Sequence, residues 1–500
     1  MNYLLGVDIG SYSAKGTLLS TSGELVATAT QPHQMSIPAP GLAEHDAEEV
    51  WWGGLRSVTR QLLTQTGIDP TAIIGVGCSG IGPCMLPVDA KGKALRQAVL
   101  YGIDTRAKAE IVEMEQRYGA AFLMRHSGGA LTSQSVGPKI LWLARNEPQT
   151  FSRAAHIVGC PTYLVQRLTG KCVVDHYGAS NYLPFYDIEK QAWSPEMTRD
   201  TCPPGMLPET AWTCDIAGLI TDSAARETGL APGTPVIVGT IDAAAEAVSV
   251  GVIGVGDLMV MYGTSIFFIQ VIPALHHDAR HWSAPYLFPG TWAAMGGVST
   301  GGALTHWFRN NIAHMAEQED AFAILAAEAA QSPPGANGLI ALPYFSGERT
   351  PINDPKARGM LFGLDLLHER ADMYRALLEG VGHATRHNLD MFDEVHPSRA
   401  IYAVGGGVNN NPWIQSSIDI SGKTQLVRRY TVGASMGSAF LAGIGIGAFE
   451  LADINRVNPI EREIHPQPHL KAGYDQAHTI YLDLYRATRT LMERVSDVEH

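Results

Sequence analysis

Residues 3–20 read YLLGVDIGSYSAKGTLLS, two short apolar runs separated by a turn of small and polar residues. The turn begins at Asp8, and the second apolar run begins at Gly16. Thr21-Ser22-Gly23 then supplies another turn. Apolar runs of this length that alternate with Gly- and Ser-containing turns predict a β-meander at the start of the chain.

The turn in this stretch has the composition of a phosphate-binding loop. Gly10 and its small neighbours let several backbone amides point into one volume, while Ser11, Ser13 and Lys15 add side-chain donors. Asp8, at the end of the preceding strand, is suited to hold a hydrated Mg²⁺, which keeps several waters and needs few carboxylates. An ordinary β-hairpin with a polar turn has the same composition, and this loop taken alone slightly favours the hairpin.

The same pattern returns in the middle of the chain. Residues 258–262 and 266–271 are apolar, and Gly263-Thr264-Ser265 forms the turn between them. An internal repeat of this kind predicts two related α/β domains, residues 1–245 and 246–500, that face each other across a cleft. A triphosphate could then be held from both sides of that cleft.

A third glycine-containing turn lies further along the chain. Gly405-Gly406-Gly407 connects a predicted strand to a predicted helix, and such a turn permits close approach of a ligand or of another backbone segment. Asn411 offers the donor and the acceptor that an adenine edge requires. Asn409 and Asn410 are better interpreted as caps of the following helix.

Asp242 is the best catalytic candidate in the chain. It ends a strand predicted over residues 235–241, and only small residues follow it, so little would block a substrate. Phosphoryl transfer to an alcohol requires a carboxylate that accepts the hydroxyl proton. Asp242 also has the position of an N-cap for the helix predicted over residues 243–250, a role that it can hold in addition.

A competing motif is found at residues 75–80, which read GVGCSG and match the GxGxxG pattern of dinucleotide-binding proteins. In those proteins the motif opens a helix that binds pyrophosphate at its N-terminus. Here Gly82-Pro83 follows, and the chain continues into another predicted strand. We therefore set the dehydrogenase interpretation aside.

Composition limits the class of protein. The 500 residues are 45% hydrophobic and 17% charged, a balance typical of globular proteins. The formal charge of −13 argues against a nucleic-acid partner, which would require a basic surface. The first residues lack the segments of a signal peptide, and no uncharged apolar run reaches the ~20 residues that span a membrane. We expect a soluble, cytoplasmic protein without a membrane partner.

Cysteine and histidine residues give little sign of a metal. The six cysteines include no CxxC pair, which indicates reduced thiols in a cytosolic protein. His276, His277 and His281 fall beside Asp278. Their loop-like context, without a second ligand cluster, favours a solvated surface over a metal site.

Together these segments resemble the FGGY carbohydrate kinases of the actin-like ATPase superfamily, from Tyr3 to about Phe449. The most specific part is PYFSGERTP at residues 343–351, which is similar almost letter for letter to the corresponding stretch of the family's xylulokinases. Other similar segments are Asn353-Asp354-Pro355, Arg358-Gly359, GLAEHD (41–46), KILW (139–142), GMLFGL (359–364) and GASMGSA (433–439).

The resemblance implies two ribonuclease-H-like (actin-like ATPase) domains with ATP, Mg²⁺ and a sugar in the cleft between them. It implies that Asp242 is the general base and that Asp8 supports Mg²⁺ and the phosphates. The phosphate loops would be Gly10 to Lys15 and Gly263-Thr264. The positions that match the family's nucleotide contacts are Gly302, His306, Gly407 and Asn411. For His306, packing beside Trp307 on a helix is the alternative.

The predicted sugar-binding end departs from the family pattern. Xylulokinases usually carry Gln-Met-His-Gly where this chain reads Ile81-Gly82-Pro83-Cys84. Proline cannot donate the hydrogen bond that the missing imidazole would make. Tyr101 stands where a tryptophan often precedes the Asp104-Thr105-Arg106 segment. The candidate substrate residues are thus Gly82, Pro83, Tyr101 and Asp104.

The resemblance implies ATP-dependent phosphorylation of a terminal hydroxyl of a small ketose, with D-xylulose as the leading candidate. The altered segment at 81–84 keeps another pentulose, a tetritol and glycerol open as alternatives. A non-kinase ATP-binding module that clamps a protein partner is a third hypothesis, against which Asp242 and the stretch at 343–359 argue. Family members are often dimers, so a homodimer is compatible with the resemblance, although the sequence identifies no interface.

Overall fold

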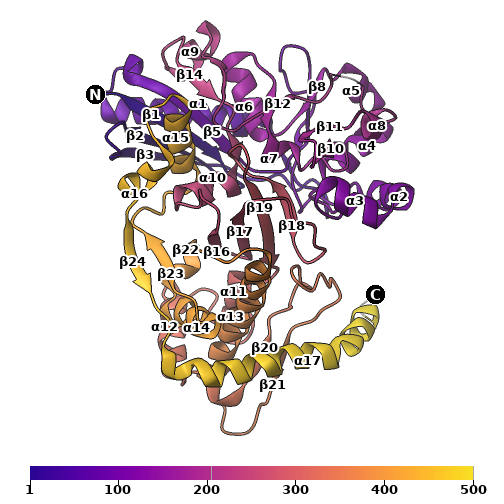
Figure 1. The fold of residues 1–500 in the computed structure, drawn as a ribbon, viewed down its shortest axis with the longest axis vertical. Helices are drawn as coiled ribbons and strands as arrows, with labels where there is room; N and C mark the ends of the chain where they lie inside the picture. The colour runs from indigo at the N-terminus through magenta and orange to yellow at the C-terminus, as the bar shows by residue number, and fades with distance from the viewer. Residues whose placement is uncertain (204, 499–500) are drawn as a thin grey trace.

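The computed structural model describes residues 1–203 and 205–498, and each half of the chain forms a seven-stranded sheet (Figure 1). The first sheet opens with β1 (Tyr3–Ile9), β2 (Ser13–Ser20) and β3 (Leu25–Pro32), which pair antiparallel. The predicted meander is therefore confirmed. Next to β1, the parallel strand β5 (Ile73–Gly80) continues the sheet. The remaining strands of this sheet are β13 (Ile216–Leu219), β14 (Pro235–Ile237) and β15 (Thr240–Ile241).

The second sheet repeats this order. Here β16 (Asp257–Tyr262) pairs antiparallel with β17 (Ile266–Ile272), which pairs antiparallel with β19 (Trp292–Val298). The strand β22 (Ala400–Val404) lies parallel to β16. The other strands are β18 (Trp282–Pro285), β23 (Gln425–Arg428) and β24 (Ile460–Ile464). The internal repeat seen in the sequence is thus a repeat of sheet topology. The boundary between residues 245 and 246 stays a prediction.

Helices cover both sheets. In the first half α1 (Gly53–Thr66) packs on β2 and β3, and α6 (Cys160–Thr169) packs on β5. In the second half α13 (Arg370–Val395) packs against α14 (Asn411–Ser421), and α11 (Gly302–Asn311) and α12 (Ala321–Ala329) lie beside them. The chain described here ends with α17 (Lys471–Val498), the long yellow helix in Figure 1.

One helix from the second half of the sequence belongs to the first sheet. Helix α15 (Ala434–Gly445) packs on β1 and β5 and against α10 (Asp242–Ser249). A hydrophobic cluster formed around it includes Leu4 of the first sheet, Met259 of the second, and Phe440 of α15. The two halves therefore share a hydrophobic core instead of being joined only by linkers.

The glycines of the GVGCSG stretch are explained by this packing. All six residues lie inside the strand β5, so the motif does not open a helix. A Cβ atom on Gly77 would lie 2.2 Å from Ser438 O of α15, and one on Gly80 would lie 2.5 Å from Cys160 Sγ of α6. These glycines let helices approach the strand closely, so the stretch serves packing and is not a dinucleotide-binding motif.

The remaining elements form an additional lobe on the first half and short hairpins elsewhere. The helices are α2 (Lys108–Tyr118), α3 (Ala120–Ser127), α4 (Val136–Asn146), α5 (Pro148–Arg153), α7 (His176–Ala179), α8 (Pro195–Thr198), α9 (Asp222–Thr228) and α16 (Ile454–Val457). The strands are β4 (Glu44–His45), β6 (Leu86–Val88), β7 (Ala98–Val99), β8 (His156–Val158), β9 (Val173–Asp175), β10 (Tyr186–Asp187), β11 (Ala192–Trp193), β12 (Glu209–Ala211), β20 (Ile340–Leu342) and β21 (Met360–Phe362).

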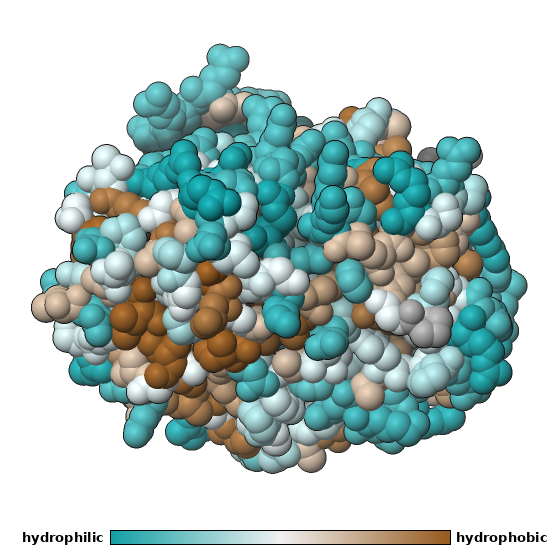
Figure 2. All heavy atoms as spheres, turned by 90° about the horizontal axis from the view of Figure 1, so that it is seen from above, coloured by the Kyte–Doolittle hydropathy of each residue, from teal (hydrophilic) through white to brown (hydrophobic). Residues whose placement is uncertain are grey.

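Figure 2 shows hydrophilic and pale residues over most of the surface seen from above, with the largest brown hydrophobic area left of and below the centre. Among the residues that the structure describes, no helix combines the length and apolar character that crossing a membrane requires.

Candidate active site

The first glycine turn connects β1 and β2, and places Asp8 opposite Lys15 in the strand register. Gly10 N donates to Ser13 O at 2.9 Å, so this amide closes the turn. The Ser11 hydroxyl lies 3.4 Å from the Tyr101 hydroxyl, which ties the turn to one of the predicted substrate residues. Lys15 is exposed, so its ammonium is accessible to an anion.

Asp8 is buried at the end of β1. The register of the parallel pair β1–β5 places it beside Ser79, whose hydroxyl donates to Asp8 Oδ1 at 2.8 Å. Burial raises the pKa of Asp8 to about 6, although the Ser79 hydrogen bond and the Lys15 charge act in the opposite direction. Ser79 is a site residue that the sequence analysis missed. Only the strand register reveals it.

Asp242 is the first residue of α10, and Ile241 is the N-cap. Ala243 N donates to Asp242 Oδ1 at 2.7 Å, so the carboxylate stabilises the helix N-terminus without being the cap. Burial and then the negative charge of Asp8 raise the pKa of Asp242 well above the ordinary range. The two predicted catalytic carboxylates are therefore close enough to interact electrostatically.

A third carboxylate, Glu246, was also missed by the sequence analysis. It follows Asp242 by four residues in α10, a spacing that places both side chains on the same face of a helix. Burial and the charge of Asp8 raise the pKa of Glu246 to about 7, against the opposing charge of Lys15. The four-residue spacing from Asp242 could have identified Glu246 from the sequence.

The second glycine turn borders a pocket of about 600 Å³ in the second half of the molecule. Gly302 N donates to Gly263 O at 2.8 Å, so the turn is joined to the start of α11. The pocket is lined by the predicted residues Gly263, Thr264, Gly302, His306 and Gly407, together with Asn409, Asn410, Phe322 and Trp413. The structure thus brings five of the predicted nucleotide residues together.

Two details of this pocket differ from the sequence expectations. Asn410 caps α14 as predicted, accepting from Trp413 N at 3.2 Å, but it also lines the pocket, as does Asn409. The His306 ring packs against Phe322, with centroids 4.8 Å apart, whereas Trp307 packs against Phe345.

Asn411 lies in a neighbouring cavity of about 670 Å³, between the first glycine turn and the Gly405–Gly407 segment. Lys15 and Glu246 line the same cavity from the first half of the chain, and Gly405, Gly406 and Gly433 line it from the second half. This cavity shares Gly406 and Asn409 with the pocket beside Gly263 and Thr264, and it has Lys15 of the first glycine turn in its lining.

A third cavity, of about 630 Å³, lies between the two halves and is bordered by Ile241 and Ala243, the chain neighbours of Asp242. Gly82, Pro83, Ile241 and Ala243 line it from the first half of the chain. Phe267, Met295, Glu348 and Arg349 line it from the second half. We call this cavity the interdomain pocket. Glu348 and Arg349 belong to the stretch at 343–351.

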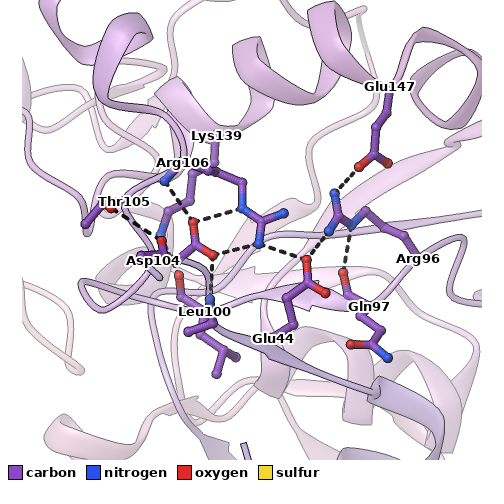
Figure 3. A network of polar contacts seen from close by, with 11 residues as sticks. Glu44, Arg96, Gln97, Leu100, Asp104, Thr105, Arg106, Lys139 and Glu147 are labelled. Carbon is purple, nitrogen blue, oxygen red and sulfur yellow. Dashed lines mark hydrogen bonds and ion pairs between the residues drawn. The ribbon is translucent and has the colours of Figure 1, made fainter. Parts of the chain in front are cut away.

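Asp104, a predicted substrate residue, lies away from these three cavities. Its carboxylate is fully buried and accepts from Ala43 N at 2.8 Å and from the Arg106 guanidinium at 2.6 and 2.8 Å. Glu44 joins Arg106 to Arg96 in the same network, which Figure 3 shows with Lys139 nearby. Every hydrogen bond of Asp104 is thus internal, and its position indicates a structural role.

The His276–His281 segment is the expected solvated surface only in part, because His277 is exposed whereas His276 and Asp278 are half-buried. His281 is only 1% exposed, and its Nε2 lies 2.9 Å from His276 Nδ1. The loop between β17 and β18 turns the His281 side chain inward, which the composition of the loop did not indicate.

Known proteins resemble this chain over its whole length. Models of the N-terminal and C-terminal domains of the FGGY family of carbohydrate kinases match residues 3–249 and 258–446. Xylulose kinase from Escherichia coli (strain K12) is 30% identical over 502 residues, covering 98% of this chain and 99% of that protein. Xylulose kinase from Lactococcus lactis subsp. lactis (strain IL1403) is 29% identical, covering 99% of each. The crystal structure of xylulose kinase from Rhodospirillum rubrum superimposes with a TM-score of 0.92 at 30% identity, covering 98% of this chain and 100% of that one.

Proposed function

Because the chain belongs to the FGGY family of carbohydrate kinases, we propose that it transfers the γ-phosphoryl group of ATP to a terminal hydroxyl of a small ketose. D-xylulose is the first candidate, since the similar E. coli, L. lactis and R. rubrum proteins are xylulose kinases. The observation that carries the proposal is the position of Asp242. Its neighbours Ile241 and Ala243 line the interdomain pocket, and its carboxylate is close enough to Asp8 of the first glycine turn for the two charges to interact.

The nucleotide is assigned to the pocket beside Gly263 and Thr264. Phe322 and Trp413 give this pocket apolar walls, and Asn409 offers a donor and an acceptor. The phosphates would extend toward Lys15, whose exposed ammonium lies across the neighbouring cavity. In this arrangement both glycine turns contact one triphosphate.

The residues around Asp8 fit Mg²⁺. Ser79 occupies Asp8 Oδ1, which leaves the other carboxylate oxygen for a hydrated cation. A bound Mg²⁺ would neutralise charge on the phosphates. Asp8 would hold the ion, and Glu246 stands close enough to Asp8 to support it.

Asp242 is assigned the proton transfer. The substrate hydroxyl loses its proton to the Asp242 carboxylate while its oxygen forms a bond to the γ-phosphorus and the bond from that phosphorus to ADP breaks. Lys15 and the turn amides stabilise the negative charge on the transferred group. The Ala243 N–H bond holds the carboxylate in place.

The sugar is assigned to the interdomain pocket. Pro83 replaces a donor there with an apolar ring, so recognition of the hydroxyls falls to other polar groups of the lining, among them Tyr177, Asn181 and Arg349. A change of donors at one wall is expected to alter which ketose is preferred.

The test is ADP production from MgATP with a panel of ketoses, aldoses and polyols, using the wild type and Asp242→Asn. We expect one ketopentose to stimulate turnover strongly, and Asp242→Asn to lower kcat by roughly 10²-fold or more. ATP binding by the variant, measured by calorimetry, should stay close to that of the wild type. Near-normal turnover by a folded Asp242→Asn protein would rule out the proton-transfer role.

A further inference from the structure

The loop between β17 and β18 brings three side chains with metal-binding atoms together. His276 Nδ1 and His281 Nε2 lie 2.9 Å apart. With a carboxylate oxygen of Asp278, the three atoms all lie within 4.8 Å of one another. Two imidazole nitrogens and one carboxylate match the three protein ligands typical of a zinc site that keeps a water in its fourth position.

The groups behind these atoms orient them. His281 Nδ1 lies 3.2 Å from Trp282 O, a contact in which the ring N–H donates to the carbonyl. This tautomer leaves the lone pair of Nε2 directed at His276, and a backbone carbonyl is one of the groups to which metal-bound histidines donate their other ring N–H. His281 is also nearly inaccessible to solvent, so its orientation is fixed by packing.

Asp278 is held by its neighbour Arg280, whose guanidinium donates to both carboxylate oxygens at 2.7–3.1 Å. Arg280 N also donates to Asp278 Oδ1 at 2.8 Å, so three donors share the about four lone-pair positions of the carboxylate and one position remains for a cation. Arg280 also pairs with Glu394 at 2.8 Å, which offsets part of its positive charge near the site.

The loop itself is anchored at several points. The Ser283 hydroxyl donates to His276 O at 2.5 Å, and Ser283 N donates to Gly128 O at 2.9 Å in the other half of the chain. Asn353 Nδ2 donates to Ala279 O at 2.7 Å. A preformed backbone lowers the cost of bringing ligands together around an ion.

We propose that His276, Asp278 and His281 form a binding site for a divalent transition metal, with Zn²⁺ as the best match. Imidazole nitrogen suits zinc, whereas Mg²⁺ requires oxygen ligands, so this site is chemically distinct from the one at Asp8. The metal fixes a loop whose residues Ala279, His281 and Trp282 line the interdomain pocket. The site therefore lies at the edge of the predicted sugar pocket.

Equilibrium dialysis of the chelator-treated full-length protein, without an affinity tag, against Zn²⁺ tests this site. Excess Mg²⁺ is added to occupy sites made of carboxylates alone. We expect one equivalent of Zn²⁺ on the wild type, and loss of that equivalent in His276→Ala and in Asp278→Asn. His277→Ala is the matched control, because His277 faces Glu189 at 3.4 Å and is not part of the cluster.

Two further readouts separate a built site from weak surface binding. Zn²⁺ should raise the Tm of the wild type and of His277→Ala but not that of His276→Ala. Co²⁺ in place of Zn²⁺ should give the visible absorption of a four-coordinate site with nitrogen ligands in the same two proteins.

Equal uptake of Zn²⁺ by the wild type and His276→Ala would overturn the proposal. So would the absence of bound Zn²⁺ on the folded wild type, because the two imidazoles would then only share a proton in a hydrogen bond. His276 is partly exposed, so its alanine variant is expected to fold where a variant of the buried His281 would be at risk.

Discussion

At Asp8, burial disfavours the ionised form of the carboxylate. Its pKa is raised to about 6, mainly because of burial, whereas an aspartate in an unfolded chain titrates near ~4. Between these values the folded state binds a proton that the unfolded state has lost, so wild-type stability falls as the pH rises through this window.

Asp8→Asn removes that effect while Asn Oδ1 can still accept from Ser79. We expect the variant and the wild type to have similar stability near pH ~4, and the variant to be more stable near pH ~7 by on the order of 2 kcal/mol. Chemical denaturation across this pH range measures the difference. A variant less stable than the wild type at the higher pH would contradict the assignment.

Asp104→Asn is the matched control, and its expected change in stability has the opposite sign to that of Asp8→Asn. Burial alone would raise the pKa of Asp104, but the hydrogen bonds from Arg106 and Ala43 N lower it. Its ionised form therefore stabilises the fold above the pKa of an unfolded aspartate and loses that effect as the pH falls through its depressed pKa. We expect Asp104→Asn to be less stable than the wild type near neutral pH, with the difference shrinking in acid.

Pro83 lines the interdomain pocket and His306 lines the pocket assigned to the nucleotide, so substitutions at these two residues should affect different substrates. We expect Pro83→Ala to change KM for the preferred ketose by about 5-fold or more, with KM for ATP changed by less than about 2-fold. His306→Ala should show the reverse, because it removes a side chain from the pocket assigned to the nucleotide. Initial-rate kinetics with each substrate varied in turn give both constants. Changes of equal size in both constants for Pro83→Ala would place it outside the sugar pocket.

At the scale of elements, α15 is held against α10 by contact of backbones. A Cβ atom on Gly437 would lie 1.9 Å from Ala245 O, and one on Gly6 would lie 1.9 Å from Ser435 O. Neither oxygen belongs to a flexible side chain, so substitution at either glycine forces the helix away from its neighbours.

Gly437→Ala is expected to destabilise the protein by about 1–3 kcal/mol, as overpacking of a tight contact does. Gly473→Ala in α17 is the control, because its Cβ would have no neighbour within 4 Å and alanine favours helix by ~1 kcal/mol over glycine. Urea unfolding of both variants compares them directly. A Gly437→Ala variant as stable as Gly473→Ala would show that α15 can shift freely.

At the scale of the whole molecule, two large cavities lie between the halves. The interdomain pocket, of about 630 Å³, and the cavity beside Lys15, of about 670 Å³, are both lined from the two halves. Phosphoryl transfer to a sugar instead of water requires that such space close around the substrates. The hydrophobic core shared through α10 and α15 joins the two sheets, and we expect such a closure to pivot there.

We expect the radius of gyration, measured by small-angle X-ray scattering, to decrease when the preferred ketose and a non-hydrolysable ATP analogue are added together. Asp242→Asn should contract as well, because it lacks the base but keeps the binding surfaces. The ketose or the analogue alone should produce a smaller change. An unchanged radius with both ligands bound would exclude closure as the means of excluding water.

The sequence by itself predicted the meander, its internal repeat and the family. These follow from local patterns, since apolar runs, glycine turns and motif strings are read over a few residues. It also identified Gly263, Thr264, Gly302, His306 and Gly407, which line one pocket in the structure. For Gly263, Thr264 and Gly407 the signal is a glycine-containing turn, whereas Gly302 and His306 were implied only by the resemblance to the family.

Only the tertiary structure placed Ser79 on Asp8, Glu246 near Asp8, and α15 on the sheet of the first half. It also showed that Asp104 lies in a buried ion network and that His281 lies in the protein interior. These features depend on which distant segments pack together, and burial and charge pairing are properties of that packing. A linear pattern shows which groups a residue can bind, whereas the fold decides which groups it meets.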